Sequence, residues 1–143
     1  MALVNIRPLK DHQGETQGAI NCFQDISAYK TMEEEARRRS ADLEDFFENS
    51  AIGLHIVSSD GIIQRANRAE LALLGYAAEE YVGRHIAEFH VDAPVIGDIL
   101  HKLSCGDRLV RYPARLRAKD GSLKHVLITS NSRFEDGKFV NTR

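Results

Sequence analysis

Histidine and carboxylate residues gather in one short segment of the sequence, where they could bind a divalent metal ion. His85, His90 and Asp92 offer two imidazoles and a carboxylate, which suit several such ions. The two histidines are five positions apart, so they do not share one face of a helix. The spacing favours capping or loop interactions instead, and we expect no metal site.

The remaining candidate groups are scattered along the chain. His55 and His125 alternate with apolar residues of expected strands, so both are predicted on the exposed face of a sheet. Scattered histidines titrate near neutrality but do not by themselves form a pH switch. His101 lies opposite an apolar arc formed by Val95, Ile96, Ile99, Leu100 and Leu103, so it should face solvent. No convergent set of polar groups indicates catalysis.

A tight turn joins the first two expected strands. Asp60 and Gly61 suit the positive φ angles of a hairpin turn between residues 52–57 and 62–65. In the first strand, Ile52, Leu54 and Ile56 are predicted to face the core, with Gly53, His55 and Val57 on the other side.

A short capped helix follows this hairpin. Asn67 can accept a hydrogen bond from the first turn, and Glu70 can complete a capping box, so a helix should begin at Arg68. Gly75 suits the left-handed residue that closes the helix, and Gly83 ends a second short segment.

Three further strands are expected to close the sheet. They are residues 108–117, 123–134 and 139–143, joined by Asp-Gly turns at 120–121 and 136–137. Alternation in the first of these strands places four residues toward the core, namely Val110, Tyr112, Ala114 and Leu116. The prediction is a five-stranded antiparallel sheet interrupted by helices.

Residues 28–49 contain no glycine or proline and are rich in strong helix formers, so they predict one long helix. It should enter the sheet through Phe46 and Phe47. An apolar seam with heptad spacing, interrupted by Arg39, favours a parallel dimer, although a solvated connector is the alternative. The seam residues are Tyr29, Met32, Ala36, Leu43 and Phe46.

Composition limits the possible partners and compartments. The 143 residues suffice for one domain with flanking elements, and the net charge of −2 gives no basic stripe for nucleic acid or anionic membranes. Neither a signal peptide nor a membrane-spanning run is expected. Cys22 and Cys105 are far apart and form no CxxC pair, which favours a reduced, cytoplasmic location without disulfides.

The order of the elements resembles a PAS domain over about residues 44–143. The resemblance rests on the opening strand pair, the Asn-started helix, GYAAEEYVG at residues 75–83, and RLRAKDGSLKHVLITS in the closing strands. It implies an α+β PAS fold with short helices on one face of the sheet. The segment PLKDHQGETQGAINCFQDIS similarly resembles the last hairpin of a preceding PAS domain.

This resemblance divides the chain into three expected parts. Residues 1–27 would be the C-terminal strands of a preceding PAS domain, residues 28–49 a linker or coiled-coil signalling helix, and residues 50–143 a PAS domain with a truncated last strand. It implies a sensory or relay module of a bacterial protein, most often a histidine kinase and less often a cyclic-dinucleotide enzyme. The sequence holds no phospho-acceptor helix, ATP lid or GGDEF-like run, so no enzymatic activity is expected.

The resemblance also bears on cofactors. The light-oxygen-voltage branch needs a cysteine in a GRNCRFLQ-like motif, and GRHIAEFH places Ile86 there, so no covalent flavin adduct is expected. The family's usual heme-ligand position falls near Val95, which cannot bind iron. Heme is therefore not expected, and the identity of any cofactor stays open.

An apolar pocket between the sheet and the short helices is the remaining candidate site for a small ligand. The alternative is that its side chains fill a close-packed core, leaving a domain that only dimerises and relays signals between neighbouring domains. The candidate lining residues are Leu54, Ile56, Leu74, Tyr81, Ile86, Phe89, Ile96, Leu100, Tyr112, Leu116, Val126, Ile128 and Ser130.

Overall fold

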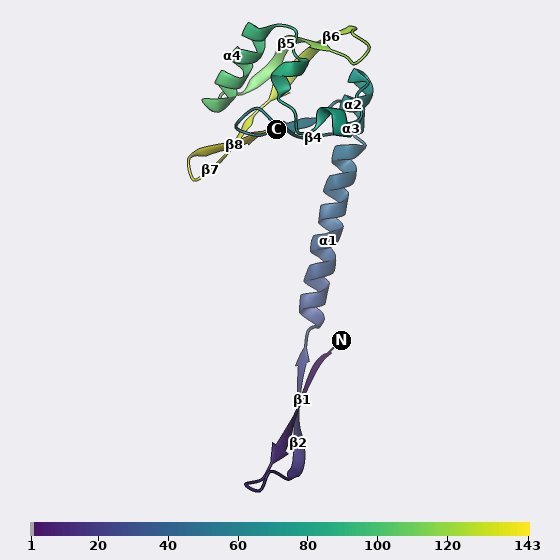
Figure 1. The fold of residues 1–143 in the computed structure, drawn as a ribbon, viewed down its shortest axis with the longest axis vertical. Coiled ribbons are helices and arrows are strands. Elements are labelled where there is room, and N and C mark those ends of the chain that lie inside the picture. The colour runs from purple at the N-terminus through teal and green to yellow at the C-terminus, as the bar shows by residue number, and fades with distance from the viewer. Residues whose placement is uncertain (1) are drawn as a thin grey trace. The chain divides into compact units, whose positions relative to one another are not determined.

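The computed structural model describes residues 2–143, which form two compact units (Figure 1). The first unit ends at Glu44 and contains an antiparallel hairpin of β1 (Ala2–Lys10) and β2 (Thr16–Asp25). Asp11 closes the hairpin by accepting hydrogen bonds from the backbone N–H groups of Gln13 and Glu15. Every side chain of β2 is exposed, so this hairpin has no core of its own.

Helix α1 (Ser27–Glu48) is 22 residues long, covers the stretch expected to be helical, and buries none of its side chains. Phe46 is 72% exposed, so the expectation that it enters the sheet is wrong. Phe47 does pack inward, because the guanidinium of Arg65 lies over its ring at 4.2 Å.

The second unit, Asp45–Arg143, holds short strands and helices around one hydrophobic core. After the end of α1 its elements are β3 (His55–Val57), β4 (Ile63–Ala66), α2 (Arg68–Leu74), α3 (Ala78–Tyr81), the 3₁₀ helix η1 (Ile86–Phe89), α4 (Ala93–Ser104), β5 (Leu109–Arg117), β6 (Leu123–Ser130), β7 (Ser132–Glu135) and β8 (Lys138–Thr142).

The strands pair in twos, so the predicted five-stranded sheet is wrong. Among the described residues β1–β2, β3–β4, β5–β6 and β7–β8 form separate antiparallel pairs, and an isolated bridge joins Ser58 to Asn141. The expected strand 123–134 breaks at Asn131, because the backbone N–H and C=O of Asn131 pair with Arg143 instead. That break separates β6 from β7.

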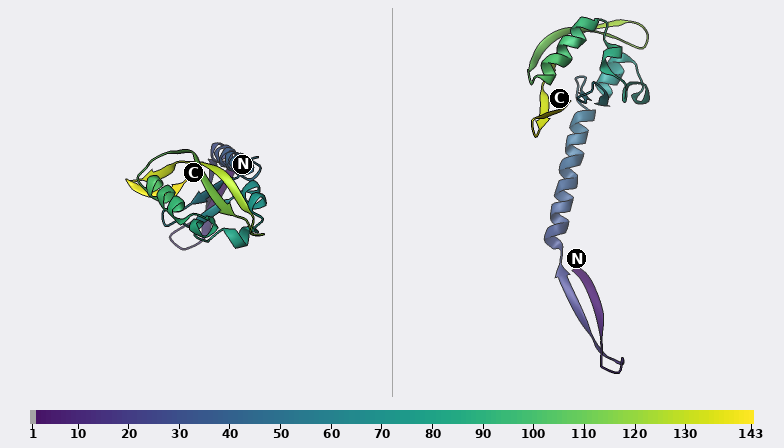
Figure 2. Two further views of the ribbon diagram at one scale, coloured as in Figure 1. Left: turned by 90° about the horizontal axis from the view of Figure 1, so that it is seen from above. Right: turned by 60° about the vertical axis from the view of Figure 1, so that its left-hand side comes forward.

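The core lies between α4, the short helices and the inner faces of the strands, and α4 lies against β5 (Figure 2). Ile96, Ile99 and Leu103 of α4 are buried, as the apolar arc predicts, and His101 is exposed. Tyr76, Tyr81 and Phe89 form an aromatic cluster in which the Tyr81 and Phe89 ring centroids lie 4.4 Å apart. Buried aromatic pairs of this kind add to the stabilisation from area alone.

Two strand faces differ from their predicted alternation. Val110 is 64% exposed and Leu109 is buried instead, because the β5–β6 register shifts between Leu109 and Tyr112, where Arg111 has a φ of 52°. A bulge of this kind reverses the faces of the residues on one side of it.

Val57 is the buried residue of β3. Ile52, which was expected in the same strand, lies before it and is 67% exposed. The strand begins only at His55 and its pairing with β4 shifts register between Ile56 and Val57. The assignment of Ile52 to the core face is therefore wrong, and Leu54 and Ile56 are only half-buried.

The N-cap of α2 is confirmed, but the capping box is wrong. The Asn67 Oδ1 accepts a hydrogen bond from the Glu70 N–H at 3.0 Å, and Gly75 closes the helix with a φ of 74°. The Glu70 side chain does not return to the Asn67 backbone N–H, which donates to the carbonyl of Leu54. Glu70 points into the core instead.

Asn67 is fully buried, and its side chain makes four hydrogen bonds. Its Oδ1 also accepts from Leu54 N–H at 2.9 Å, and its Nδ2 donates to the carbonyls of Phe47 at 3.0 Å and Ile52 at 2.9 Å. One amide thus joins the end of α1, the entry to β3 and the start of α2.

We expect Asn67→Ala to lower the free energy of unfolding by about 3 kcal/mol, because it leaves several buried backbone groups unsatisfied. Urea unfolding followed by circular dichroism measures the change. The matched control is Asn131→Ala, whose exposed side chain should cost less than about 0.5 kcal/mol. Equal losses in the two variants would contradict the central role of Asn67.

Candidate functional site

Two adjoining voids lie between the strands and helices of the second unit. A groove of about 320 Å³ runs between the residues that lead into β3 and the strand β6, and a smaller cavity of about 30 Å³ lies against α4. Four residues line both voids, namely His55, His90, Ile128 and Ser130. The smaller cavity is large enough for a water molecule.

A buried carboxylate lies at the polar end of the groove. The Glu70 Oε1 accepts a hydrogen bond from the Tyr81 hydroxyl at 3.0 Å and lies 3.1 Å from the His55 Nδ1. Burial alone would raise the pKa of the Glu70 carboxyl, but the bond to His55 and its charge, together with the Tyr81 bond, hold that pKa below its usual value. Burial and the Glu70 charge raise the pKa of Tyr81, so Tyr81 stays a donor.

His90 completes this polar group from the segment that follows η1. Its Nδ1 is buried and has no hydrogen-bond partner among the described residues. Burial, together with the charge of nearby His55, lowers the pKa of His90 to about 4, although the charges of Glu70 and Asp92 oppose the shift. His90 is therefore neutral at physiological pH, with one unsatisfied ring nitrogen beside the cavity.

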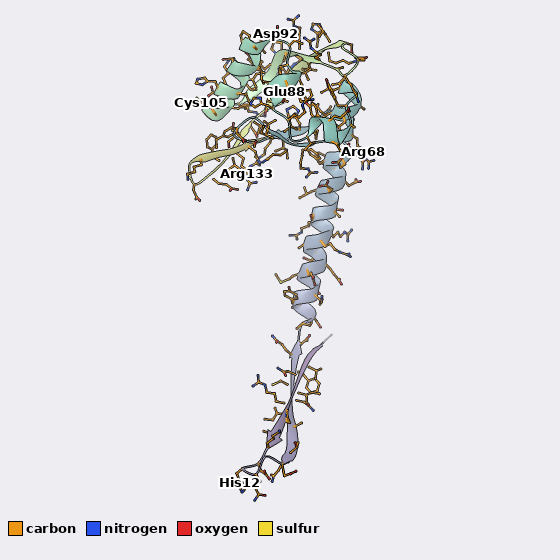
Figure 3. The ribbon with its side chains drawn as sticks, in the orientation of Figure 1. His12, Arg68, Glu88, Asp92, Cys105 and Arg133 are labelled. Carbon is orange, nitrogen blue, oxygen red and sulfur yellow. The ribbon has the colours of Figure 1, made fainter. Side chains whose placement is uncertain are left out.

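The expected capping role of His85 is confirmed, and the described residues contain no cluster that could hold a metal ion. The His85 Nδ1 accepts from the Ala87 N–H, and Glu88 reaches back to the His85 N–H, which starts η1. Asp92 pairs with Arg115 and lies before α4, while exposed Cys105 follows the other end of that helix (Figure 3).

The predicted lining residues separate into three groups. Those that line the groove are Leu54, Leu116, Val126, Ile128 and Ser130, and those that line the smaller cavity are Ile86, Ile96, Leu100, Ile128 and Ser130. The remaining ones line neither void: Leu74, Tyr81 and Phe89 are buried in the packed core, and Ile56 and Tyr112 are half-buried. The Tyr112 hydroxyl donates to Asp98 on α4 and does not face the groove.

Sequence reasoning missed the polar side of the groove. His55 was predicted on a sheet surface and Glu70 in a capping box, but the structure brings both together with His90. One signal was available for Glu70, since it is four residues before the buried Leu74 and thus shares its helix face. His125, by contrast, is exposed as predicted.

The smaller cavity does not fit a large cofactor. Its volume of about 30 Å³ is far below that of a flavin ring system or a heme, and Ile86 and Ile96 close it from the helical side. The helix α4 presents no inward-facing histidine, because His101 is exposed. The residues around this cavity therefore do not fit a flavin or a heme.

The second unit belongs to a known family, because the PAS fold family matches residues 47–141. A solved PAS domain of an HTR-like protein from Haloarcula marismortui is 28% identical, with a TM-score of 0.66, and the match covers 80% of this chain and 98% of that one. The chain is therefore a member of the PAS family, whose domains are sensory signalling modules.

Two further structures share the fold at lower identity. A domain of a sensory box sensor histidine kinase/response regulator from Geobacter sulfurreducens is 19% identical, with a TM-score of 0.58 and coverage of 73% of this chain and 91% of that one. A PAS domain of a two-component sensor histidine kinase is 12% identical, with a TM-score of 0.62 and coverage of 75% and 94%. No curated protein matches the chain. Among residues 2–143, no helix has both the length and the apolar character needed to cross a membrane.

The low pKa of His90 predicts a loss of stability on acidification. In the unfolded chain His90 takes up a proton below about pH 6.5, whereas in the folded state it does so only near pH 4, so protons favour unfolding between these values. We expect the free energy of unfolding to fall by about 1–2 kcal/mol between about pH 7 and about pH 5, measured by urea unfolding. The stability that ionised Glu70 contributes is lost mainly below this pH range, because the folded pKa of its carboxyl lies under 4.5.

His90→Phe should remove most of this pH dependence of the free energy of unfolding. His125→Phe, at an exposed position, should keep it. A pH dependence that survives unchanged in His90→Phe would show that another group causes it.

Proposed function

We propose that this chain is a sensory or signal-relay PAS module of a bacterial multidomain signalling protein, with a sensor histidine kinase as the first candidate parent. The proposal is supported by family membership and by the similar domains of sensor histidine kinases. The chain itself is not an enzyme in this proposal, because its sequence has no catalytic motif of such kinases. A reducing, cytoplasmic location, argued from the two separated cysteines, belongs to the same proposal.

Each of the three parts of the sequence has its own proposed role. Residues 1–27 supply the closing strands of a preceding PAS domain, residues 28–49 form the signalling helix, and residues 50–143 are the sensing domain. The observed hairpin without a core supports the first assignment, because an isolated two-stranded hairpin is at best marginally stable in water. Its partner strands would then lie in a neighbouring domain.

The single observation that carries the relay proposal is the exposed apolar seam of α1. Four large apolar residues are each about two-thirds exposed or more, namely Tyr29 at 67%, Met32 at 70%, Leu43 at 70% and Phe46 at 72%. Together with Ala36 they recur at heptad spacing, interrupted by Arg39. Pairing with the same seam of a second copy would bury them in a parallel coiled coil.

A physical link between the sensing core and the helix supports transmission. The carbonyl of Phe47 accepts a hydrogen bond from Asn67, Arg65 covers the Phe47 ring, and Glu48 pairs with Arg65 at 3.6 Å. A change in packing around Asn67 would therefore act directly on the last turn of α1. Rotation or tilt of a paired helix is an established way to pass such a change onward.

The alternative function is a ligand-free dimerisation and relay domain in a histidine kinase or cyclic-dinucleotide enzyme. The small volume of the inner cavity favours it, because most of the predicted lining residues near α4 are close-packed. The open groove with its polar end favours ligand binding instead. Titration with candidate ligands distinguishes the ligand-free relay domain from the ligand-binding one.

Changing Leu43 and Phe46 together to glutamate should weaken the dimer, because the substitutions place like charges in the seam. We expect the dimer dissociation constant to rise at least about tenfold, measured by sedimentation equilibrium. The control is Thr31→Glu with Ala41→Glu, which adds the same charge to exposed positions outside the seam. If the seam variant dimerises as tightly as the control, α1 is not the interface.

A further inference from the structure

Two polar atoms at the polar end of the groove, Glu70 Oε2 and His90 Nδ1, have no hydrogen-bond partner among the described residues. Both contacts of the Glu70 carboxylate, to His55 and to Tyr81, use Oε1, and no described residue donates to Oε2. His90 Nδ1 is likewise buried without a partner. Buried polar atoms are nearly always satisfied, so His90 Nδ1 calls for a partner outside the described residues, and the neighbouring Glu70 Oε2 can accept from the same partner.

The space beside Glu70 depends on a glycine. A Cβ atom at Gly53 would collide with the Glu70 Oε2, so the Glu70 carboxylate can take this position only because residue 53 has no side chain. Glu70 therefore contributes to the lining of the groove together with Gly53, His55 and His90.

The remaining walls of the groove are mostly apolar. Leu116, Val126 and Ile128 contribute from β5 and β6, and Leu54 contributes from the segment that leads into β3. The volume of about 320 Å³ is at the small end of the range for small-molecule sites, which is roughly 300–1,000 Å³. The groove thus combines an apolar body with a polar end at Glu70, and Thr129, Ser130 and Arg143 add further polar groups to its lining.

We propose that the groove binds a small amphipathic molecule whose cationic N–H head group donates to Glu70 Oε2, with His90 Nδ1 as a second acceptor and the apolar body against β5 and β6. This inference rests on the proposed sensory function and names its class of ligand. An ionised carboxylate only accepts hydrogen bonds, so the head group must be a donor, and charge-assisted bonds are stronger than neutral ones. An anionic head group at the same place would be repelled by the Glu70 carboxylate, although Arg143 elsewhere in the lining is cationic.

Three probes with the same aromatic ring and different heads test the proposal on the whole chain of residues 1–143. Phenethylamine carries an ammonium, 2-phenylethanol a hydroxyl and 3-phenylpropanoate a carboxylate. Binding is followed by titration of ¹⁵N-labelled protein, using the backbone amides of Gly53 and Leu54. We expect phenethylamine to bind at least about tenfold more tightly than the other two.

Glu70→Gln should reduce the affinity for phenethylamine to that for 2-phenylethanol, because it removes the charge and keeps the shape. The matched control Glu79→Gln, at an exposed position of α3, should leave all three affinities unchanged. The comparison of probes on the unaltered protein stands by itself if Glu70→Gln does not fold.

Equal binding of all three probes, or a preference for the carboxylate, would overturn the proposed head group and leave the groove as a ligand site. The absence of binding by every probe would overturn the inference together with the ligand-sensing part of the proposed function. The relay part is decided separately by the sedimentation of the α1 variants.

Discussion

The fold of the second unit depends on one buried amide. Asn67 satisfies two backbone N–H groups and two backbone carbonyls at once, and these belong to Phe47, Ile52, Leu54 and Glu70. The Asn67 side chain is fully buried, and its bond to Glu70 is buried while the other three are partly buried. A buried polar network is stabilising only when every member is satisfied, so this amide fixes three chain segments together.

The same constraint determines where Glu70 points. Its N–H is held by Asn67, and its place one turn before the buried Leu74 directs its side chain to the core. An isolated buried carboxylate would be costly, but Tyr81 donates to it and His55 lies beside it, which keeps it ionised. The capping residue thus places a charge at the end of the groove, and it does so through backbone geometry alone.

Short sequence motifs predicted much of this fold, but the register between paired strands did not follow from them. The turns at Gly61, Gly75 and Gly137 each need a positive φ, which short sequence motifs reveal. The faces of β3 and β5 were mispredicted because register shifts near Ile56 and Arg111 depend on partner strands. The apolar lining of the groove could be read from alternation, whereas its polar members come from three distant segments, and each had a plausible local role.

Glu70 in α2 and Asn67 at the N-cap of that helix connect the proposed ligand site with the proposed signalling helix. A donor that binds Glu70 Oε2 would act on the first turn of α2, whose N-cap is the residue that holds the Phe47 carbonyl at the end of α1. The connection from Glu70 through Asn67 to the Phe47 carbonyl is short and contains no flexible loop, since Asn67 immediately precedes α2. A ligand that has different affinities for two arrangements of this cap would shift the equilibrium between them, and α1 would follow because its last turn shares the same hydrogen bonds.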